Sequence, residues 1–424
     1  MYAHFARAQI TLLRSNEMKK LLSILLSILL VSTLVFTVTA CKNSSESESV
    51  DESVAPVTIT VKSAKEDGVD VNTLTEISLS AAAKSYIDDH NLDGLATLFK
   101  THTDSATTEQ KVKDDIKWFT IDVANGKVKL EIPATITHIA TNAVANLTFI
   151  TDLVVNNSVV EIEKGAFAGL SGLETITLPF VGSKLGAKNG AKLFAYIFGS
   201  VGGEGLTAVT QTYNDGAEST ESLYVPTSLK TVTVNGNVTY TEEEIRAYKD
   251  GDDYIPLADG EDVPDGFTEV IISQISYKDS AIQPYAFFGI TTVETIIFAG
   301  EKVDMIPDNA FNGCTAIKAL HFDGEIVIGR NAYANCTSLK KLTFGETAAV
   351  VILEGAFNGC SSLGASTQTT KGGLDLTHVT FIDKDAFQGC TSLRKETLVL
   401  GSHTEESLKD AFDKDFFEDE EENA

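Results

Sequence analysis

Apolar residues recur in the second half of the chain with the spacing L-x-x-L-x-L. Two clear copies cover Ile317–Phe322 and Leu339–Phe344. The end of each copy alternates apolar and polar residues, which is typical of a strand with one buried face. An aromatic residue precedes each copy, at Phe311 and at Tyr333. We therefore predict one strand in each unit, with its apolar side chains directed into a core.

The same spacing predicts further strands along the chain. Alignment on it adds Ile150–Val155, Leu173–Leu178, Leu229–Val234, Phe267–Ile272 and Val293–Phe298. Trp118–Val123 is either a first coil or part of a cap. Leu363 begins a copy that Gly364 interrupts, and Leu393–Leu400 is a last, irregular copy.

The period of the pattern predicts the fold class. The aromatic residues Phe287, Phe311, Tyr333 and Phe357 follow one another at 24, 22 and 24 residues. A period of this length with an L-x-x-L-x-L core is the signature of a leucine-rich-repeat solenoid, in which coils stack to share one core. We expect an α+β repeat protein with strand-rich coils over residues 131–400.

Two coils contain long excursions, which we expect to form loop insertions at about 181–228 and 235–266. The first is rich in glycine and contains an apolar run at Leu193–Phe198. The second is acidic; its acids are Asp250, Asp252, Asp253, Asp259, Glu261, Asp262 and Asp265. A calcium loop is an alternative for Asp250–Tyr254, but Ile255 stands where an EF-hand requires glycine. Insertions of repeat proteins often lie on the binding face.

The unit A-F-x-G-C-x-S-L resembles the BspA-type leucine-rich repeat of bacterial surface proteins. The passages Leu178–Gly182, Tyr196–Gly199 and Val225–Val232 share the resemblance, which covers roughly 132–400. It implies surface display and adhesion to proteins of a host or partner cell. It implies no catalysis, no cofactor and no shared binding residue. The chain departs from the pattern at 141–170 and around 363–376.

The N-terminus has the features of a secretory signal. Met18-Lys-Lys is followed by a long apolar run that ends at Thr39-Ala-Cys41. This ending resembles the bacterial lipobox, which implies that Cys41 is the lipidated first residue of an exported, membrane-anchored protein on the cell surface or outer membrane. We expect 1–40 to be the signal peptide, with the true start at Met18, and 41–56 to be a disordered tether. An uncleaved membrane anchor is the alternative.

The repeats have a separate region on each side. Residues 57–130 contain helical patterns at Ile77–His90, Leu92–Phe99 and Thr108–Lys117, and we expect an α-rich capping region there. Residues 401–424 contain a possible capping helix at Glu405–Phe417 and an acidic tail.

The charge of the chain disfavours one class of partner. The 60 acidic and 33 basic residues give a net charge of −27. Without residues 1–40 the chain has 59 acidic and 29 basic residues, a net charge of −30. Such a field opposes nucleic-acid binding and favours basic partners.

Four cysteines occupy one slot of the repeat. Cys314, Cys336, Cys360 and Cys390 each stand three residues after the repeat aromatic, where other units have Leu147, Leu170 and Ile290. A slot that accepts leucine is apolar, so we predict buried thiols. Disulfides between neighbouring coils are an alternative. A zinc site is disfavoured because paired C-x-x-C ligands are absent from the sequence.

The outward positions of the strands change sign along the repeats. Early units present Asp152, Glu174 and Glu294, and late units present Lys318, His321, Lys340, Lys341, Arg394 and Lys395. These basic residues form our candidate binding surface, although surface lysines that protect an exposed sheet are an alternative. We expect a non-enzymatic lipoprotein that binds a protein or glycan. An enzyme or substrate-binding module with its chemistry in the insertions, or a structural envelope protein, remains possible.

Overall fold

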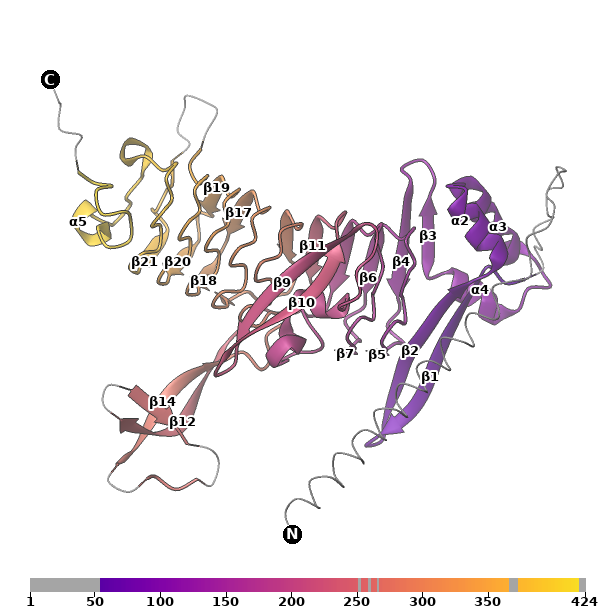
Figure 1. The fold of residues 1–424 in the computed structure, drawn as a ribbon, viewed down its shortest axis with the longest axis horizontal. Helices are drawn as coiled ribbons and strands as arrows, with labels where there is room; N and C mark the ends of the chain where they lie inside the picture. Colours follow the sequence, from indigo (N-terminus) through magenta and orange to yellow (C-terminus); the bar gives the residue numbers. More distant parts are fainter. Residues whose placement is uncertain (1–53, 251–252, 258–260, 265–266, 366–372, 419–424) are drawn as a thin grey trace, which may run out of the picture. The chain divides into compact units, whose positions relative to one another are not determined.

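A computed structural model describes residues 54–250, 253–257, 261–264, 267–365 and 373–418 (Figure 1). The chain divides into two units, residues 1–50 and 51–424, and every described residue belongs to the second. Cys41 and the proposed signal peptide lie outside the described residues. Within the described ranges, no helix has both the length and the apolar character needed to cross a membrane.

The repeat region is built on a ladder of short parallel strands. The six-stranded sheet has the order β15-β11-β8-β6-β4-β3, and only its β3–β4 pair is antiparallel. A separate pair, β17 and β19, continues the series in parallel. The strands are β3 (Phe119–Asp122), β4 (Lys127–Ile132), β6 (Asp152–Val155), β8 (Thr175–Leu178), β11 (Thr231–Val234), β15 (Thr295–Phe298), β17 (Ala319–Phe322) and β19 (Lys341–Phe344). Their register pairs equivalent positions of successive repeats, as in Val232 with Ile296.

Six of the predicted repeat strands are confirmed as β6, β8, β11, β15, β17 and β19. The prediction at Phe267–Ile272 was wrong as a repeat strand. That segment contributes to β14 (Glu269–Ser276), which pairs antiparallel with β12 (Thr241–Asp250), while β11 pairs directly with β15. Alternation shows that a strand has two different faces, but it does not show which strand is its partner.

The two ends of the strand series also differ from expectation. The segment at Trp118–Val123 is β3, an antiparallel partner of β4, and β4 itself was not predicted. The copy at Leu393–Leu400 contains a short 3-10 turn, η3 (Lys395–Thr397), and joins its neighbour through a single bridge between Asp375 and Val399.

A second series of short strands follows a different edge of the repeats and was not predicted. One sheet has the order β1 (Val57–Glu66), β2 (Val69–Leu79), β5, β7, and another has the order β16-β18-β20-β21. The repeat members are β5 (His138–Ile139), β7 (Glu161–Ile162), β16 (Met305–Ile306), β18 (Glu325–Ile328), β20 (Ala349–Ile352) and β21 (Val379–Ile382). Each ends in an isoleucine five residues before the repeat aromatic slot. That isoleucine is the signal that could have located them.

Aromatic rings form a column through the core. Phe311 stacks on Tyr333 with ring centroids 5.0 Å apart, and Tyr333 stacks on Phe357 at 5.7 Å. The column also contains Phe194, Phe287, Phe387 and Phe412. These seven side chains are each at most 3% exposed. One ring from each repeat therefore shields the ring of the next.

The turn after each aromatic needs a left-handed backbone. Gly313 has φ of 77° and Asn335, at the equivalent position, has φ of 58°. Glycine and asparagine adopt this region at the lowest cost. This explains the Gly or Asn that stands directly before each repeat cysteine.

The region before the repeats is not purely α-rich, so that prediction needs correction. It begins with a long antiparallel hairpin of β1 (Val57–Glu66) and β2 (Val69–Leu79). Three helices follow: α2 (Ala81–Asp88), α3 (Leu92–Asp104) and α4 (Gln110–Ile116). The alternating residues of Val57–Val61 carried the strand signal. In this region β2 pairs with β5, and β3 pairs with β4.

The first predicted insertion is only partly a loop. Most of Val181–Phe198 is buried, with two 3-10 turns, η1 (Asn189–Lys192) and η2 (Phe194–Ile197). The N–H of Phe194 donates to the carbonyl of Ala286, so this segment packs as part of the repeats. The true excursion is an antiparallel hairpin, β9 (Leu206–Asn214) and β10 (Glu218–Pro226).

The second predicted insertion is a sheet rather than a loop. β12 lies between β13 (Asp253–Pro256) and β14 in three antiparallel strands. Three acids of this excursion lie outside the described residues: Asp252, Asp259 and Asp265. Of these, Asp252 belongs to the run Asp250–Tyr254, for which a calcium loop was the alternative.

The C-terminal helix is shorter than predicted. α5 covers only Glu405–Leu408 and begins with a capping box at Thr404. Beyond it, Phe412 stacks on Phe387, so a ring rather than a long helix covers the last repeat. The acidic tail beyond Glu418 lies outside the described residues.

Candidate binding surface

The outward face of the strand ladder is dominated by threonine in its middle. Register aligns Asp152, Thr175, Thr231 and Thr295 in one row across four strands. Inward neighbours such as Leu153 and Val232 are completely buried. The ladder therefore presents a regular polar surface on a rigid apolar base.

The acidic residues of the early repeats are engaged with neighbours. Asp152 accepts hydrogen bonds from Thr151 and Thr175, each at 2.6 Å. Glu174 forms an ion pair with Lys127. These acids therefore stabilise the surface of the ladder and do not form an open acidic patch.

Lys318 and Lys340 occupy neighbouring positions, as their spacing predicts. The N–H of Lys340 donates to the carbonyl of Lys318 at 2.9 Å. The ammonium group of Lys318, however, forms an ion pair with Glu294, which also lies 3.8 Å from Lys230. The hydrogen bond from Lys318 lowers the pKa of Glu294. Glu294 therefore reduces the repulsion between the neighbouring side chains of Lys318 and Lys340.

The other predicted basic residues separate into two groups. His321 contacts Thr343 at 2.9 Å and Asp323 at 3.1 Å on the ladder. Lys340 and Lys341 are exposed there, and neither ammonium has a partner among the described residues. The structure brings these residues together with Lys318 on two adjacent strands.

Arg394 and Lys395 are occupied away from these strands. The guanidinium of Arg394 donates to the carbonyls of Thr391 and Leu393. The ammonium of Lys395 donates to the carbonyl of Phe417 at 2.9 Å and pairs with Glu405 at 3.5 Å. Both residues order the C-terminal segment.

The predicted burial of the four repeat cysteines is confirmed, and all four are free thiols. Each thiol donates to the carbonyl of the aromatic residue one repeat earlier. Cys314 contacts Phe287 at 3.1 Å, and Cys336, Cys360 and Cys390 repeat this bond at 3.2–3.3 Å. Burial raises the pKa of Cys314. Within the described ranges, no group of three His, Cys, Asp or Glu residues is placed to hold a metal ion.

A groove on the second strand series was not predicted from the sequence. A hollow of about 630 Å³ lies over β18 and β20, beside Tyr240 and Lys302. Val327 and Val351 form part of its floor. Its lining extends from residue 240 to residue 380, and only the stacking of repeats brings these positions together.

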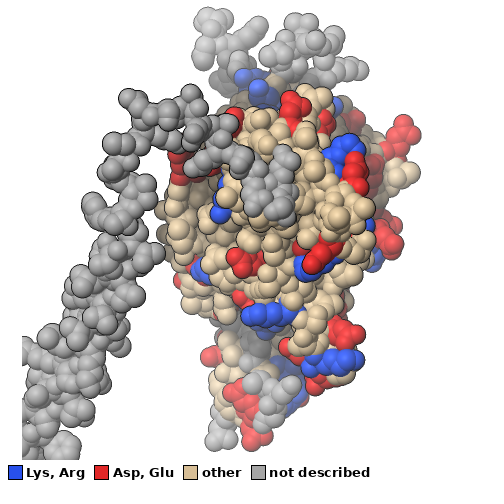
Figure 2. All heavy atoms as spheres, turned by 90° about the vertical axis from the view of Figure 1, so that its right-hand side faces the viewer, with Lys and Arg blue, Asp and Glu red and all other residues tan. Residues whose placement is uncertain are grey.

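On the face that Figure 2 turns to the viewer, acidic and basic residues are mixed rather than clustered. Figure 2 shows acidic and basic side chains interspersed among neutral ones on the face turned to the viewer. The N-terminal region contains ion pairs such as Lys100 with Asp104 and Lys111 with Asp115.

Comparison with known proteins agrees with the repeat architecture. Residues 124–189 and 266–394 match a family described as the BspA type leucine rich repeat region, in six copies. The gap between the two segments contains most of the two excursions. No curated protein matches.

Solved structures of bacterial leucine-rich-repeat proteins are similar at low identity. A leucine rich repeat protein of T. pallidum is 12% identical, with 66% of this chain and 90% of that chain covered and a TM-score of 0.26. A leucine-rich repeat protein of Bacteroides ovatus is 17% identical, with 63% and 59% covered and a TM-score of 0.24. Superpositions at these scores carry no argument about function. The family match and the laddered strands show that residues 124–189 and 266–394 contain leucine-rich repeats of the BspA type.

Proposed function

We propose that the protein is an exported, lipid-anchored surface protein that binds a macromolecule of a host or partner cell without catalysis. The six BspA-type copies support this reading, because repeats of this type suggest protein interaction or adhesion in general. The signal-like N-terminus and Cys41 support export and anchoring.

In this proposal the repeats form one solenoid with covered ends. Parallel pairing between consecutive repeats supports stacking from β4 to β15 and from β16 to β21. The pairing of β2 with β5 supports a capping role for the region at 57–130. The ring of Phe412 supports the same role at the other end. Repeat proteins with covered ends present long surfaces for partners.

The observation that carries the binding proposal is the pair of exposed lysines on the late ladder. Lys340 and Lys341 lie beside the partly neutralised Lys318 in a chain with a net charge of −27. A cationic site held on a rigid sheet suits an acidic protein patch or a sulfated glycan. Contacts of this kind weaken as salt screens them.

Binding to immobilised heparin, as a sulfated probe, and to serum and matrix proteins tests this site. The full chain carrying Cys41→Ser serves as parent. We expect Lys318→Glu, Lys340→Glu and Lys341→Glu together to abolish binding with unchanged circular dichroism. Lys62→Glu, Lys84→Glu and Lys414→Glu, three exposed lysines outside these strands, are the matched control. If both triple variants bind as well as the parent, the ladder lysines are not the binding site, and the groove beside Tyr240 becomes the candidate.

The lipid anchor has its own test. Cys41→Ser should leave the chain unlabelled by a clickable palmitate and release it from the membrane fraction. Cys336→Ser, which leaves Cys41 in place, should retain both the label and the membrane location. A fully labelled Cys41→Ser variant would contradict the lipoprotein assignment.

A further inference from the structure

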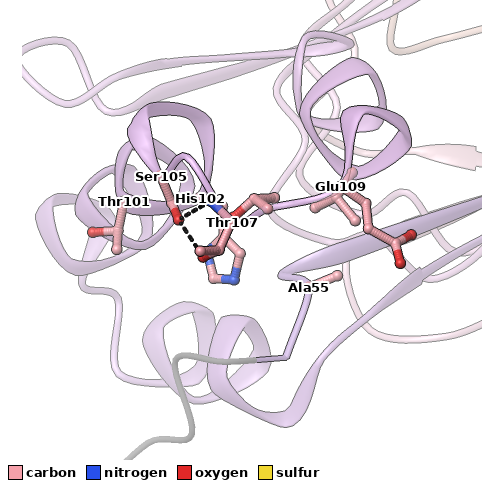
Figure 3. A pocket seen from close by; sticks show the side chains of 8 residues that line it. Ala55, Thr101, His102, Ser105, Thr107 and Glu109 are labelled. Atoms are coloured by element: carbon pink, nitrogen blue, oxygen red, sulfur yellow. Dashed lines mark hydrogen bonds between the residues drawn. The ribbon is translucent and has the colours of Figure 1, made fainter.

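A polar cavity lies in the N-terminal region, outside the repeats. It has a volume of about 440 Å³, within the range of small-molecule sites. It lies between the end of α3 and the segment leading into α4, and Ala55 closes one side (Figure 3). The lining side chains that matter for recognition are Thr101, His102, Ser105, Thr107, Thr108 and Glu109.

His102 is the buried polar group of this cavity. Its side chain belongs to a residue only 5% exposed, and Nδ1 lies 3.0 Å from the carbonyl oxygen of Leu98. A carbonyl can only accept, so Nδ1 carries the proton and Nε2 of the neutral ring has a free lone pair. Nε2 has no partner among the described residues. The only buried side-chain atoms without a partner in the described residues are Thr292 Oγ1 and Tyr333 Oη, so Nε2 is open to the cavity and can accept a hydrogen bond from a ligand there.

The rest of the lining also accepts more hydrogen bonds than it donates. The hydroxyl of Thr101 donates its proton to the carbonyl of Thr97 at 2.9 Å, which leaves only lone pairs for the cavity. Ser105 Oγ accepts from the N–H of Thr107 at 3.2 Å and shares a proton with its hydroxyl at 3.0 Å. Figure 3 shows this pair beside the His102 ring.

Glu109 supplies the charge of the cavity. Its carboxylate makes no cap bond to α4 and has no partner among the described residues. Figure 3 places it across the cavity from the Ser105–Thr107 pair, with Ala55 between them and the carboxylate. The described lining contains no lysine or arginine. An anionic ligand would therefore meet a carboxylate and several lone pairs with no compensating cation.

We propose that this cavity binds a small hydroxylated amine, such as an amino alcohol or a hexosamine. The ammonium group lies against Glu109, and a hydroxyl of the ligand donates to His102 Nε2. A second hydroxyl is placed to donate to Thr101 Oγ1 and to accept from Thr108. This site is independent of the ladder lysines and of the function proposed for them.

Glucosamine is the probe, with glucose as the matched neutral compound. The full chain in detergent is titrated by calorimetry, and the imidazole resonances of ¹⁵N-histidine-labelled protein are followed. We expect glucosamine to bind at least tenfold more tightly than glucose and to shift one histidine among the seven. That resonance should be absent from His102→Gln.

Variants separate recognition from folding. Glu109→Gln retains the size of the side chain and breaks no bond within the described fold, so it should remain folded and lose at least tenfold in glucosamine affinity. Glu76→Gln, at an exposed position on β2, should bind as the parent does. The proposal is overturned if the parent does not bind glucosamine, if glucose binds equally well, or if Glu109→Gln leaves the affinity unchanged.

Discussion

The early and the late repeats fill the same core slots with different side chains. In the first repeat the aromatic slot holds Val144 and the slot three residues later holds Leu147, whereas the late repeats hold rings and cysteines. The backbone does not change with them. The N–H of Val144 donates to the carbonyl of Ala166 at 3.0 Å, and the N–H of Tyr333 donates to that of Ala356 at 2.8 Å.

The turn and its backbone bonds therefore define a repeat, while the side chains set how tightly it packs. Late neighbours such as Tyr333 and Phe357 stack almost flat, with 4° between their ring planes. In the middle of the chain, Phe198 instead meets Phe167 edge to face at 61°. We therefore expect the late column of rings to respond to substitution as one cooperative unit.

The largest expected effect is loss of a ring from the late column. Phe357→Ala removes a fully buried side chain stacked on both Tyr333 and Phe387, and should cost about 3–5 kcal/mol in the free energy of unfolding. Val144→Ala, in the same slot of an early repeat, should cost about 2 kcal/mol because it removes only two methyl groups. Chemical denaturation measures both. If both variants lose the same free energy of unfolding, stacking between the rings contributes nothing beyond the filling of the slot.

In the middle of the chain, an ion pair joins a buried lysine to an exposed aspartate. Lys192 is 3% exposed and pairs with Asp215 at the hairpin of β9 and β10, and the N–H of Asn189 donates to Asp215 at 2.5 Å. Burial opposes ionisation of Asp215, but the hydrogen bonds from Lys192 and Asn189 outweigh it and lower the pKa. Lys192→Met leaves the carboxylate without its cation and should cost about 2 kcal/mol, less than for a fully buried pair because solvent screens Asp215.

The sign of the pH dependence follows from that lowered pKa. Asp215 releases its proton more readily when folded, so its contribution is present above the unfolded value, about 3.9, and is lost as the pH falls through the folded value. Denaturation series between pH 6 and pH 3 should therefore show a smaller loss of stability in Lys192→Met than in the parent. If stability falls equally with pH in Lys192→Met and in the parent, the ion pair does not control the stability of this segment.

The cysteine slot should give a smaller effect. Cys336 is completely buried and its thiol donates to the carbonyl of Phe311 at 3.3 Å. Cys336→Ala should cost about 1–2 kcal/mol, as loss of a small core group does. Ellman titration of the Cys41→Ser chain should find few reactive thiols in the native state and about four after denaturation without reductant. Absence of thiols after denaturation would mean that the cysteines are paired.

The repeats were predictable from sequence because each strand carries its own apolar spacing. The error at Phe267–Ile272 arose because β14 has that spacing in an antiparallel sheet. The second strand series was not predicted because members such as Met305–Ile306 are only two residues long, too short to show an alternating pattern. α5 ends at Leu408 although the helical pattern of the sequence continues, since the following residues place Phe412 on Phe387.

The candidate sites were harder to predict than the fold. Adjacent positions of Lys318 and Lys340 followed from the period, but the partner of Lys318 is Glu294, one repeat in the other direction. The cavity at His102 joins Ala55 to seven positions between 101 and 112, which no motif connects. Its signal is a largely buried histidine whose ring faces a cavity, and this becomes visible only when α3 is packed.

The smallest expected effect concerns the one hydroxyl in the late ring column. Tyr333 occupies a slot that Phe311 and Phe357 fill on either side, and its buried hydroxyl has no hydrogen-bond partner among the described residues. Burial also raises the pKa of this phenol. A buried hydroxyl without a partner costs about 1–3 kcal/mol, while its removal leaves a small void that offsets part of the gain. We expect Tyr333→Phe to raise the free energy of unfolding by about 1 kcal/mol. Phe357→Tyr, which adds a hydroxyl to the same column, should lower it. If Tyr333→Phe is destabilising in thermal and chemical denaturation, the hydroxyl has a partner in solution, and the late column is not held by ring stacking alone.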